Sequence, residues 1–146
     1  MKWYFASRTK HAPALSQVKN ELRKQGHTIL YDWTVLGTLK PYKANTQAAG
    51  EVARQIIEVL NDVDVFVLLI DEGGTDMFVE LGAALHTWHT RQKHMRIYAV
   101  GQYTDRSLMH CHPAIQTCET VEQVFVKEDT SILTPDMIKT VSQLVL

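Results

Sequence analysis

The chain has 146 residues and carries 15 Lys and Arg against 16 Asp and Glu, a formal net charge of -1. This length predicts one domain over residues 1–146. The balanced charge gives no electrostatic reason to expect a nucleic-acid polymer or a membrane surface as a partner. The longest apolar run, residues 65–70, is far shorter than the ~20 residues of a membrane span. Two cysteines are too few for a disulfide framework and fit a reducing compartment, so we expect a cytoplasmic protein.

Strand and helix patterns alternate along the first part of the chain. A short aromatic run at residues 3–6 predicts a strand, and Pro13 opens a helical stretch that stops at Gly26. Residues 28–31 predict a second strand. Residues 32–46 have no clear period and predict a long loop, and loops of this length are often functional.

The second part begins with helical spacing over residues 47–60 and continues with the strongest strand, residues 64–70. This strand is continuously apolar, which is typical of a strand buried on both faces of a parallel sheet. A helix over residues 76–90 and a strand over residues 95–100 follow. The remaining elements are weaker: a strand at residues 114–118 and helices at residues 121–127 and 135–146.

This alternation predicts an α/β fold, a single doubly wound, flavodoxin-like domain with a parallel five-stranded sheet in the order 2-1-3-4-5. Such sheets bind ligands beyond the carboxyl ends of their strands, near the switch point between the first and third strands. The loops that follow Ala6, Tyr31, Ile70 and Val100 are therefore the places to look for a site.

The loop after the third strand contains adjacent glycines, Gly73 and Gly74, and leads into a helix with Thr75 as a candidate N-cap. The free N–H groups of a first helical turn favour an anion or an oxygen-rich ligand. The alternative is a tight turn with no ligand. A Gly-x-Gly-x-x-Gly motif and a phosphate-loop Lys are both missing here, which disfavours dinucleotide dehydrogenases and nucleoside triphosphatases.

Glu80 interrupts a stretch in which nearly every neighbour is apolar or small. Its carboxylate either lies on the one solvated face of the helix or is half-buried at the ligand edge of the sheet. In the second case desolvation raises its pKa, as in many functional carboxylates.

Aromatic and charged residues follow the first two strands and could sandwich a base or hold a sugar hydroxyl or phosphate. The alternative for Trp33 is an aromatic that covers the edge of the core. These candidates are Phe5, Ser7 and Arg8 after the first strand, and Tyr31, Asp32 and Trp33 after the second.

The histidines do not predict a metal site. His86 and His89 lie three residues apart on one helix, and residues 110–112 form a His-Cys-His cluster. Neither group has the second spaced pair that zinc requires, so we expect no metal and no cofactor. A thiol nucleophile at Cys111 is also disfavoured, because sequence neighbours rarely point at one another.

Several segments together resemble the nucleoside 2-deoxyribosyltransferase-like superfamily, which includes deoxyribosyltransferases and nucleotide N-glycosidases. The most specific is the Glu-Leu-Gly-Ala-Ala motif that begins at Glu80, after a glycine-bearing loop. The resemblance covers about residues 2–126 and leaves the C-terminal helix, residues 134–146, outside. The supporting segments are residues 3–7, 26–27, 31–34, 62–65 and 74–75.

The resemblance implies attack on the N-glycosidic bond of a nucleoside or nucleotide. Glu80 would be the nucleophile and form a covalent glycosyl-enzyme, which water or a second base would then resolve. Ser7 and Arg8 would bind sugar or phosphate oxygens, and residues 73–75 would line the same pocket. Relatives of this kind pair their subunits, so a homodimer or a higher homo-oligomer is expected, with Met77, Leu85 and Trp88 supplying apolar area.

The chain departs from this superfamily near Ile56, where the superfamily has an assisting Asp. Asp32 and Asp71 are the carboxylates that could take over its part. Two other functions stay open. One is a nucleotide-binding module without turnover, and the other is a Toll/interleukin receptor-like NAD glycohydrolase with a helix glutamate.

Overall fold

The computed structural model describes residues 1–91 and 94–144. A five-stranded parallel sheet in the order β2-β1-β3-β4-β5 forms its centre, as the sequence predicts for a flavodoxin-like fold. The strands are β1 (Lys2–Ala6), β2 (Thr28–Ile29), β3 (Val65–Leu69), β4 (Arg96–Val100) and β5 (Ile115–Cys118). The helices are α1 (Ala12–Lys24), α2 (Thr46–Val59), α3 (Asp76–Thr90), α4 (Val121–Lys127) and α5 (Pro135–Val141).

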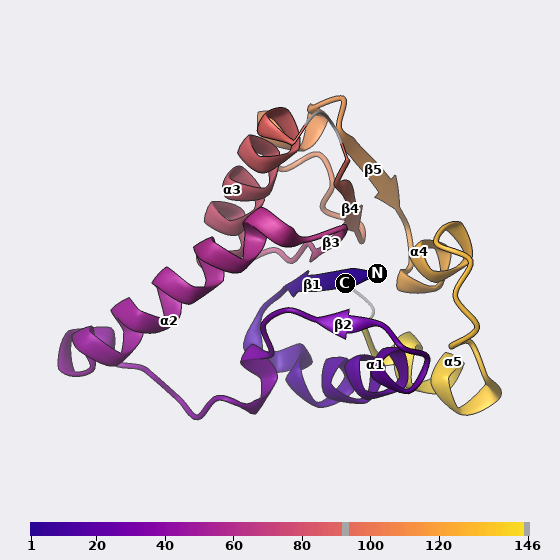
Figure 1. Cartoon of the computed structure of the whole chain (residues 1–146), viewed down its shortest axis with the longest axis horizontal. Coiled ribbons are helices and arrows are strands. Elements are labelled where there is room, and N and C mark those ends of the chain that lie inside the picture. Colours follow the sequence, from indigo (N-terminus) through magenta and orange to yellow (C-terminus); the bar gives the residue numbers. More distant parts are fainter. Residues whose placement is uncertain (92–93, 145–146) are drawn as a thin grey trace.

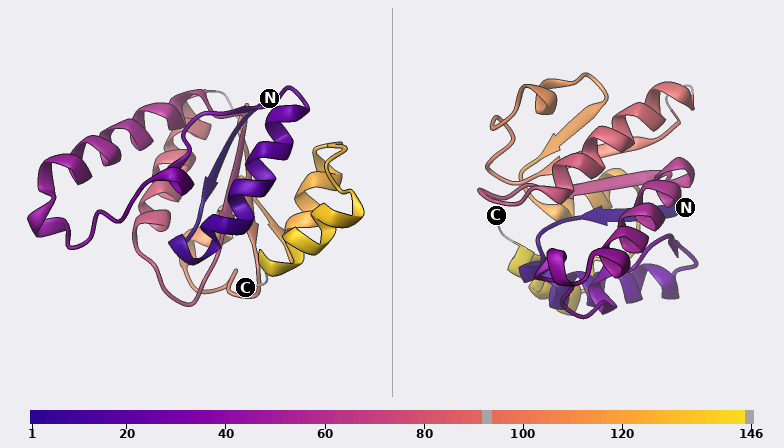
Figure 2. Two further views of the ribbon diagram at one scale, coloured as in Figure 1. Left: turned by 90° about the horizontal axis from the view of Figure 1, so that it is seen from below. Right: turned by 90° about the vertical axis from the view of Figure 1, so that its left-hand side faces the viewer.

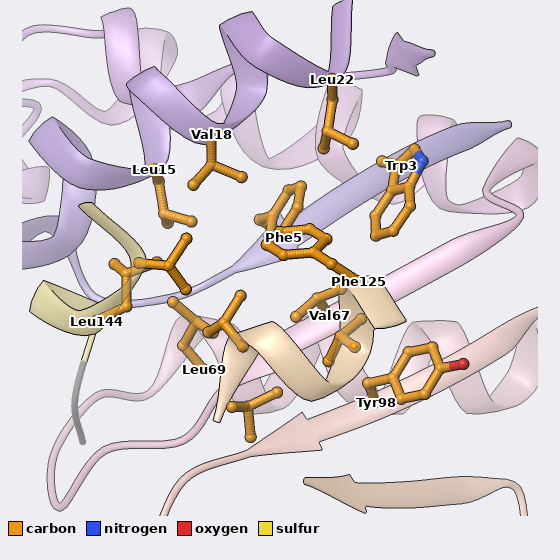
Figure 3. Close-up of a cluster of buried hydrophobic side chains, with 14 of the residues drawn as sticks. Trp3, Phe5, Leu15, Val18, Leu22, Val67, Leu69, Tyr98, Phe125 and Leu144 are labelled. Carbon is orange, nitrogen blue, oxygen red and sulfur yellow. The ribbon is translucent and has the colours of Figure 1, made fainter. Parts of the chain in front are cut away.

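Helices cover both faces of the sheet (Figure 1). Helices α1, α4 and α5 pack on one face, over a core that includes Trp3, Phe5 and Phe125 (Figure 3). Helices α2 and α3 lie on the other face, where Tyr4 and Phe66 stack with ring centroids 5.8 Å apart. Successive β1 residues alternate between these two cores, because neighbouring strand side chains point to opposite faces.

Two predicted boundaries are wrong, those of the second strand and of the C-terminal helix. The strand β2 is only two residues long. Tyr31 packs against the core under α2 and α3, and the chain then turns, because the Asp32 side chain accepts a hydrogen bond from the backbone N–H of Thr34 over 3.2 Å. The long loop contains two short 3-10 turns, Trp33–Val35 and Tyr42–Ala44. The C-terminal helix ends at Val141 and continues as a 3-10 turn to Leu144, while residues 145–146 lie outside the described residues.

Helix α2 is the least buried of the five α-helices. None of its residues is fully buried, whereas α1 buries five. Figure 2 shows it reaching away from the sheet at the end of the long loop. Among the described residues, no helix is long and apolar enough to cross a membrane.

Candidate functional site

A groove of about 600 Å³ lies between α2, α3 and the loop that leads into α2. This volume is in the range of sites that hold a small molecule. Three small residues of α2, Ala49, Gly50 and Ala53, leave the space open, and the walls are mostly apolar. Three elements supply the other lining residues. They are Leu39, Tyr42 and Lys43 from the loop, Thr46, Val52, Ile56 and Ile57 from α2, and Asp76, Val79 and Glu80 from α3.

Glu80 is a half-buried carboxyl at this groove. Burial raises its pKa from 4.5 to about 7, and the like charge of Asp76 adds to the increase. Tyr4 and the more distant Lys19 act in the opposite direction. The half-buried alternative from the sequence therefore describes Glu80, and the solvated-face alternative does not.

The Tyr4 side chain on β1 approaches Glu80 from the sheet. Its hydroxyl is buried and makes no hydrogen bond of ordinary geometry within the described residues. It nevertheless lies close enough to the Glu80 carboxylate for the two groups to interact: burial raises the pKa of Tyr4 strongly, and Glu80 raises it further. A neutral phenol therefore faces the carboxyl, and sequence reasoning missed it because Tyr4 reads as an ordinary strand residue.

Asp76 is a second carboxylate in the groove, one helical turn before Glu80. Residues four apart in a helix lie on the same face. The Tyr42 hydroxyl donates a hydrogen bond to Asp76 Oδ2 over 3.2 Å, and the Thr75 hydroxyl donates one to Oδ1 over 3.3 Å. The sequence does not predict the contact between Tyr42 and Asp76, because 34 residues separate the two in the chain.

Asp71 lies outside the groove, in a cationic cluster at the carboxyl end of β3. Its buried carboxylate pairs with Arg8 Nη1 at 3.0 Å and with Lys10 Nζ, and it accepts the Gly73 N–H at 3.2 Å. Arg106 donates to its backbone carbonyl. Burial alone would raise the pKa of Asp71, but the hydrogen bonds from Lys10 and Arg8 outweigh it and hold the pKa well below its usual range. Asp71 therefore stays ionised at neutral pH.

Asp32 is held in the same way on the other side of β1. Lys19, which is fully buried, donates to Asp32 Oδ1 over 3.1 Å, and Arg23 donates to Oδ2 over 2.6 Å. Burial opposes ionisation, but hydrogen bonds from Thr34, Arg23 and Lys19 hold the pKa of Asp32 far below normal. Neither of the two carboxylates offered in place of the missing Asp has a proton to donate at neutral pH.

Two predicted substrate-binding aromatics serve the core instead. Phe5 is fully buried under α1, in a stack with Trp3, so its side chain cannot reach a ligand. Trp33 donates from Nε1 to the carbonyl of Phe5 over 2.6 Å, and Lys19 Nζ lies 4.7 Å from its ring centroid. The alternative reading of Trp33, as a cover for the edge of the core, therefore describes it.

The remaining predicted residues follow β1, β2 and β3 and are not among the residues that line the groove. The Ser7 hydroxyl donates to the Arg8 carbonyl over 3.2 Å. A Cβ added at Gly73 would lie 3.2 Å from Arg8 Nη1, which is a tight contact, so glycine lets the Arg8 guanidinium lie close to the backbone here. Gly74 has a φ of +95°, a conformation that favours glycine. Thr75 makes no side-chain cap and instead donates to Asp76. Tyr31 is half-buried against the core that contains Tyr4.

The apolar residues of α3 are arranged differently from the expectation for a dimer. Met77 and Leu85 are buried in the core, so they offer no free surface. Trp88 is half-buried against the same core. Val79 is 66% exposed and lines the groove.

Across residues 1–91 and 94–144, no group of three or more His, Cys, Asp or Glu could hold a metal ion.

No protein-family model matches the chain, and no curated protein or solved structure matches it either.

Proposed function

We propose that this protein cleaves or transfers the N-glycosidic bond of a nucleoside or nucleotide, with Glu80 as the nucleophile. The observation that carries the proposal is the position of Glu80, a half-buried carboxyl in an apolar groove that is large enough for a nucleoside. The resemblance of the motif that begins at Glu80 to the nucleoside 2-deoxyribosyltransferase-like superfamily supplies the reaction.

Attack on the anomeric carbon develops positive charge on the sugar, which a carboxylate in an apolar surrounding stabilises strongly. The raised pKa of Glu80 makes the ionised group more basic than a solvated glutamate, and the neutral Tyr4 hydroxyl stabilises the anion. The surrounding aliphatic and aromatic walls suit a nucleobase. Lys43 is the cation of the groove and could contact a phosphate.

A panel of substrates tests this proposal. The purified protein is incubated with deoxynucleosides, deoxynucleoside monophosphates and NAD, and base release is measured with and without a second free base. We expect release from a nucleoside or nucleotide, with water or the second base as acceptor. Release of nicotinamide alone would favour the NAD glycohydrolase, and binding with no release would favour the non-catalytic module, which the apolar Ile56 in the groove also favours.

We further propose that a second copy of the chain covers α2. This helix has no fully buried residue, and Ile57 on it and Val79 on α3 are 44% and 66% exposed. Arg54 lies between Glu51 and Glu58 on the same helix, so this surface carries both charges and can complement itself across a two-fold axis. Light scattering at tens of micromolar should give at least a dimer. A monomer would contradict this, and Ile57→Glu should dissociate the dimer.

A further inference from the structure

The groove holds an acid that none of the sequence arguments identified. Asp76 and Glu80 lie one turn apart on α3 and line the same groove. The negative charge of Asp76 raises the pKa of Glu80, so the two carboxyls interact. The buried Tyr4 hydroxyl, which has no ordinary hydrogen bond, faces Glu80 from the other side and marks this point of the groove as a polar site.

Asp76 differs from the other two carboxylates that were candidates for the acid. No Lys or Arg of the described residues lies within 4 Å of it, whereas Asp71 and Asp32 each pair with two such cations. Its partners are the hydroxyls of Tyr42 and Thr75, which position a carboxyl without adding a positive charge. Within the described residues, the Asp76 carboxyl is therefore held in the groove by hydroxyl groups and not by cations.

The opposite wall of the groove has no acid that could protonate a leaving base. Ile56 on α2 lines the groove with an alkyl side chain, which has no proton to give. Lys43 lies on the loop, and an ammonium group is a much weaker acid than a carboxyl. Among the residues that line the groove, Asp76 is the carboxyl that remains once Glu80 acts as nucleophile.

We propose that Asp76 is the general acid of this groove and protonates the leaving base while Glu80 attacks the sugar. This inference rests on the proposed function. A Glu80 carboxylate oxygen forms a bond to the anomeric carbon, and the bond from that carbon to the base nitrogen breaks. The electron pair of that bond stays on the base, which takes the Asp76 proton. The products are a glycosyl ester at Glu80, an ionised Asp76 and a neutral base.

The second half of the reaction restores the starting state. The Asp76 carboxylate removes a proton from water, whose oxygen bonds to the anomeric carbon as Glu80 leaves as a carboxylate. With a second base as acceptor, its ring N–H gives the proton instead. The cycle requires the two carboxyls to share one proton, and interacting carboxyls hold such a proton more tightly than a single one does.

The test compares leaving groups that do and do not need a proton. The panel supplies a substrate, and its partner is an analogue that departs unaided: the 7-methylated base for a purine, or 4-nitrophenolate for a pyrimidine. We expect Asp76→Asn to lower kcat by about 10²–10⁴-fold on the ordinary substrate and by less than about threefold on the activated analogue. Glu80→Gln should lower both. Asp136→Asn, an exposed aspartate on α5, is the matched control and should lower neither.

Adding an acid on the opposite wall gives a second, independent readout. The double variant Asp76→Asn with Ile56→Asp should recover at least tenfold of the lost rate. Equal losses on the two leaving groups, or an unchanged rate in Asp76→Asn, would overturn the assignment of Asp76 and leave Glu80 as nucleophile intact. No base release by the wild-type protein from any substrate would overturn the proposed function, and the role of Asp76 with it.

Discussion

Two regions of this molecule carry carboxylates near the same sheet, and their surroundings are opposite. At the carboxyl end of β3, Asp71 is enclosed by Arg8 and Lys10, with Arg106 on its backbone carbonyl. Between α2 and α3, Glu80 faces apolar walls, a phenol and a second carboxyl. Loss of hydration acts on both groups, but only Asp71 has cations that replace the water.

Burial alone does not decide what a carboxylate does. Cations that replace the hydration shell turn Asp71 and Asp32 into fixed anions that hold the fold together. Without such cations, Glu80 keeps a pKa of about 7 and can change its charge under ordinary conditions. Chemistry is therefore expected in the groove and structural stability at the ion pairs.

The largest expected effect is the loss of base release in Glu80→Gln. The change preserves the shape of the side chain and removes the nucleophilic charge, so turnover should fall by about 10²–10⁴-fold while substrate binding survives. Base release and calorimetric binding measure the two effects. Glu119→Gln replaces an exposed glutamate after β5 and is the matched control. Unchanged turnover in Glu80→Gln would place the nucleophile elsewhere.

The ion-paired carboxylates should affect stability instead. Asp32→Ala leaves the fully buried Lys19 without its partner, which should cost about 3–5 kcal/mol in the free energy of unfolding. Urea unfolding measures it. Lys19→Met in the same background should recover most of the loss. Glu21→Gln, which breaks an exposed pair with Lys24, should cost less than about 1 kcal/mol. Equal costs for the two ion pairs would contradict the contrast.

The two kinds of carboxyl should also give opposite pH dependences. The folded state raises the pKa of Glu80 from 4.5 to about 7, so its contribution to stability is full below pH 4.5 and is lost as the pH rises through 7. Asp32 has a lowered pKa, so its contribution is present above pH 3.8 and is lost in acid. Glu80→Gln should therefore be more stable than wild type by about 3 kcal/mol at pH 8 and little different at pH 4.5. A pH-independent difference between these proteins in urea unfolding would contradict this.

The smallest of these effects concerns the groove itself. Ala53→Phe fills the space between α2 and α3 and should raise KM by about tenfold, a cost of about 1.4 kcal/mol, with stability unchanged. Val126→Phe adds the same ring to an exposed position of α4, on the other face of the sheet, and should leave KM as it is. Steady-state kinetics compares the two variants, and an equal KM in both would show that substrate binds elsewhere.

The sequence predicts the sheet well because its signals are local. The apolar run of β3 and the helix that ends near Gly26 are readable from neighbours in the chain. Glu80 stands out for the same reason, as one charge among apolar residues. The order of the strands then follows from general rules of α/β folds.

The rest of the site depends on contacts between distant residues. The cations on Asp71 and Asp32 come from other elements, up to 63 residues away, and no local pattern announces them. Tyr42 reaches Asp76 because the long loop folds back on α3. Phe5 was expected at the ligand edge, but the alternation of strand residues turns it into the core on the other face.

Trapping of the reaction intermediate tests the central claim most directly. A 2-fluorinated nucleoside slows the breakdown of a glycosyl ester, and mass spectrometry of the digested protein locates the adduct. The account predicts a glycosyl group on the peptide that contains Glu80, and none on the same peptide of Glu80→Gln. An adduct on another residue, or release of base without any adduct on Glu80, would contradict it.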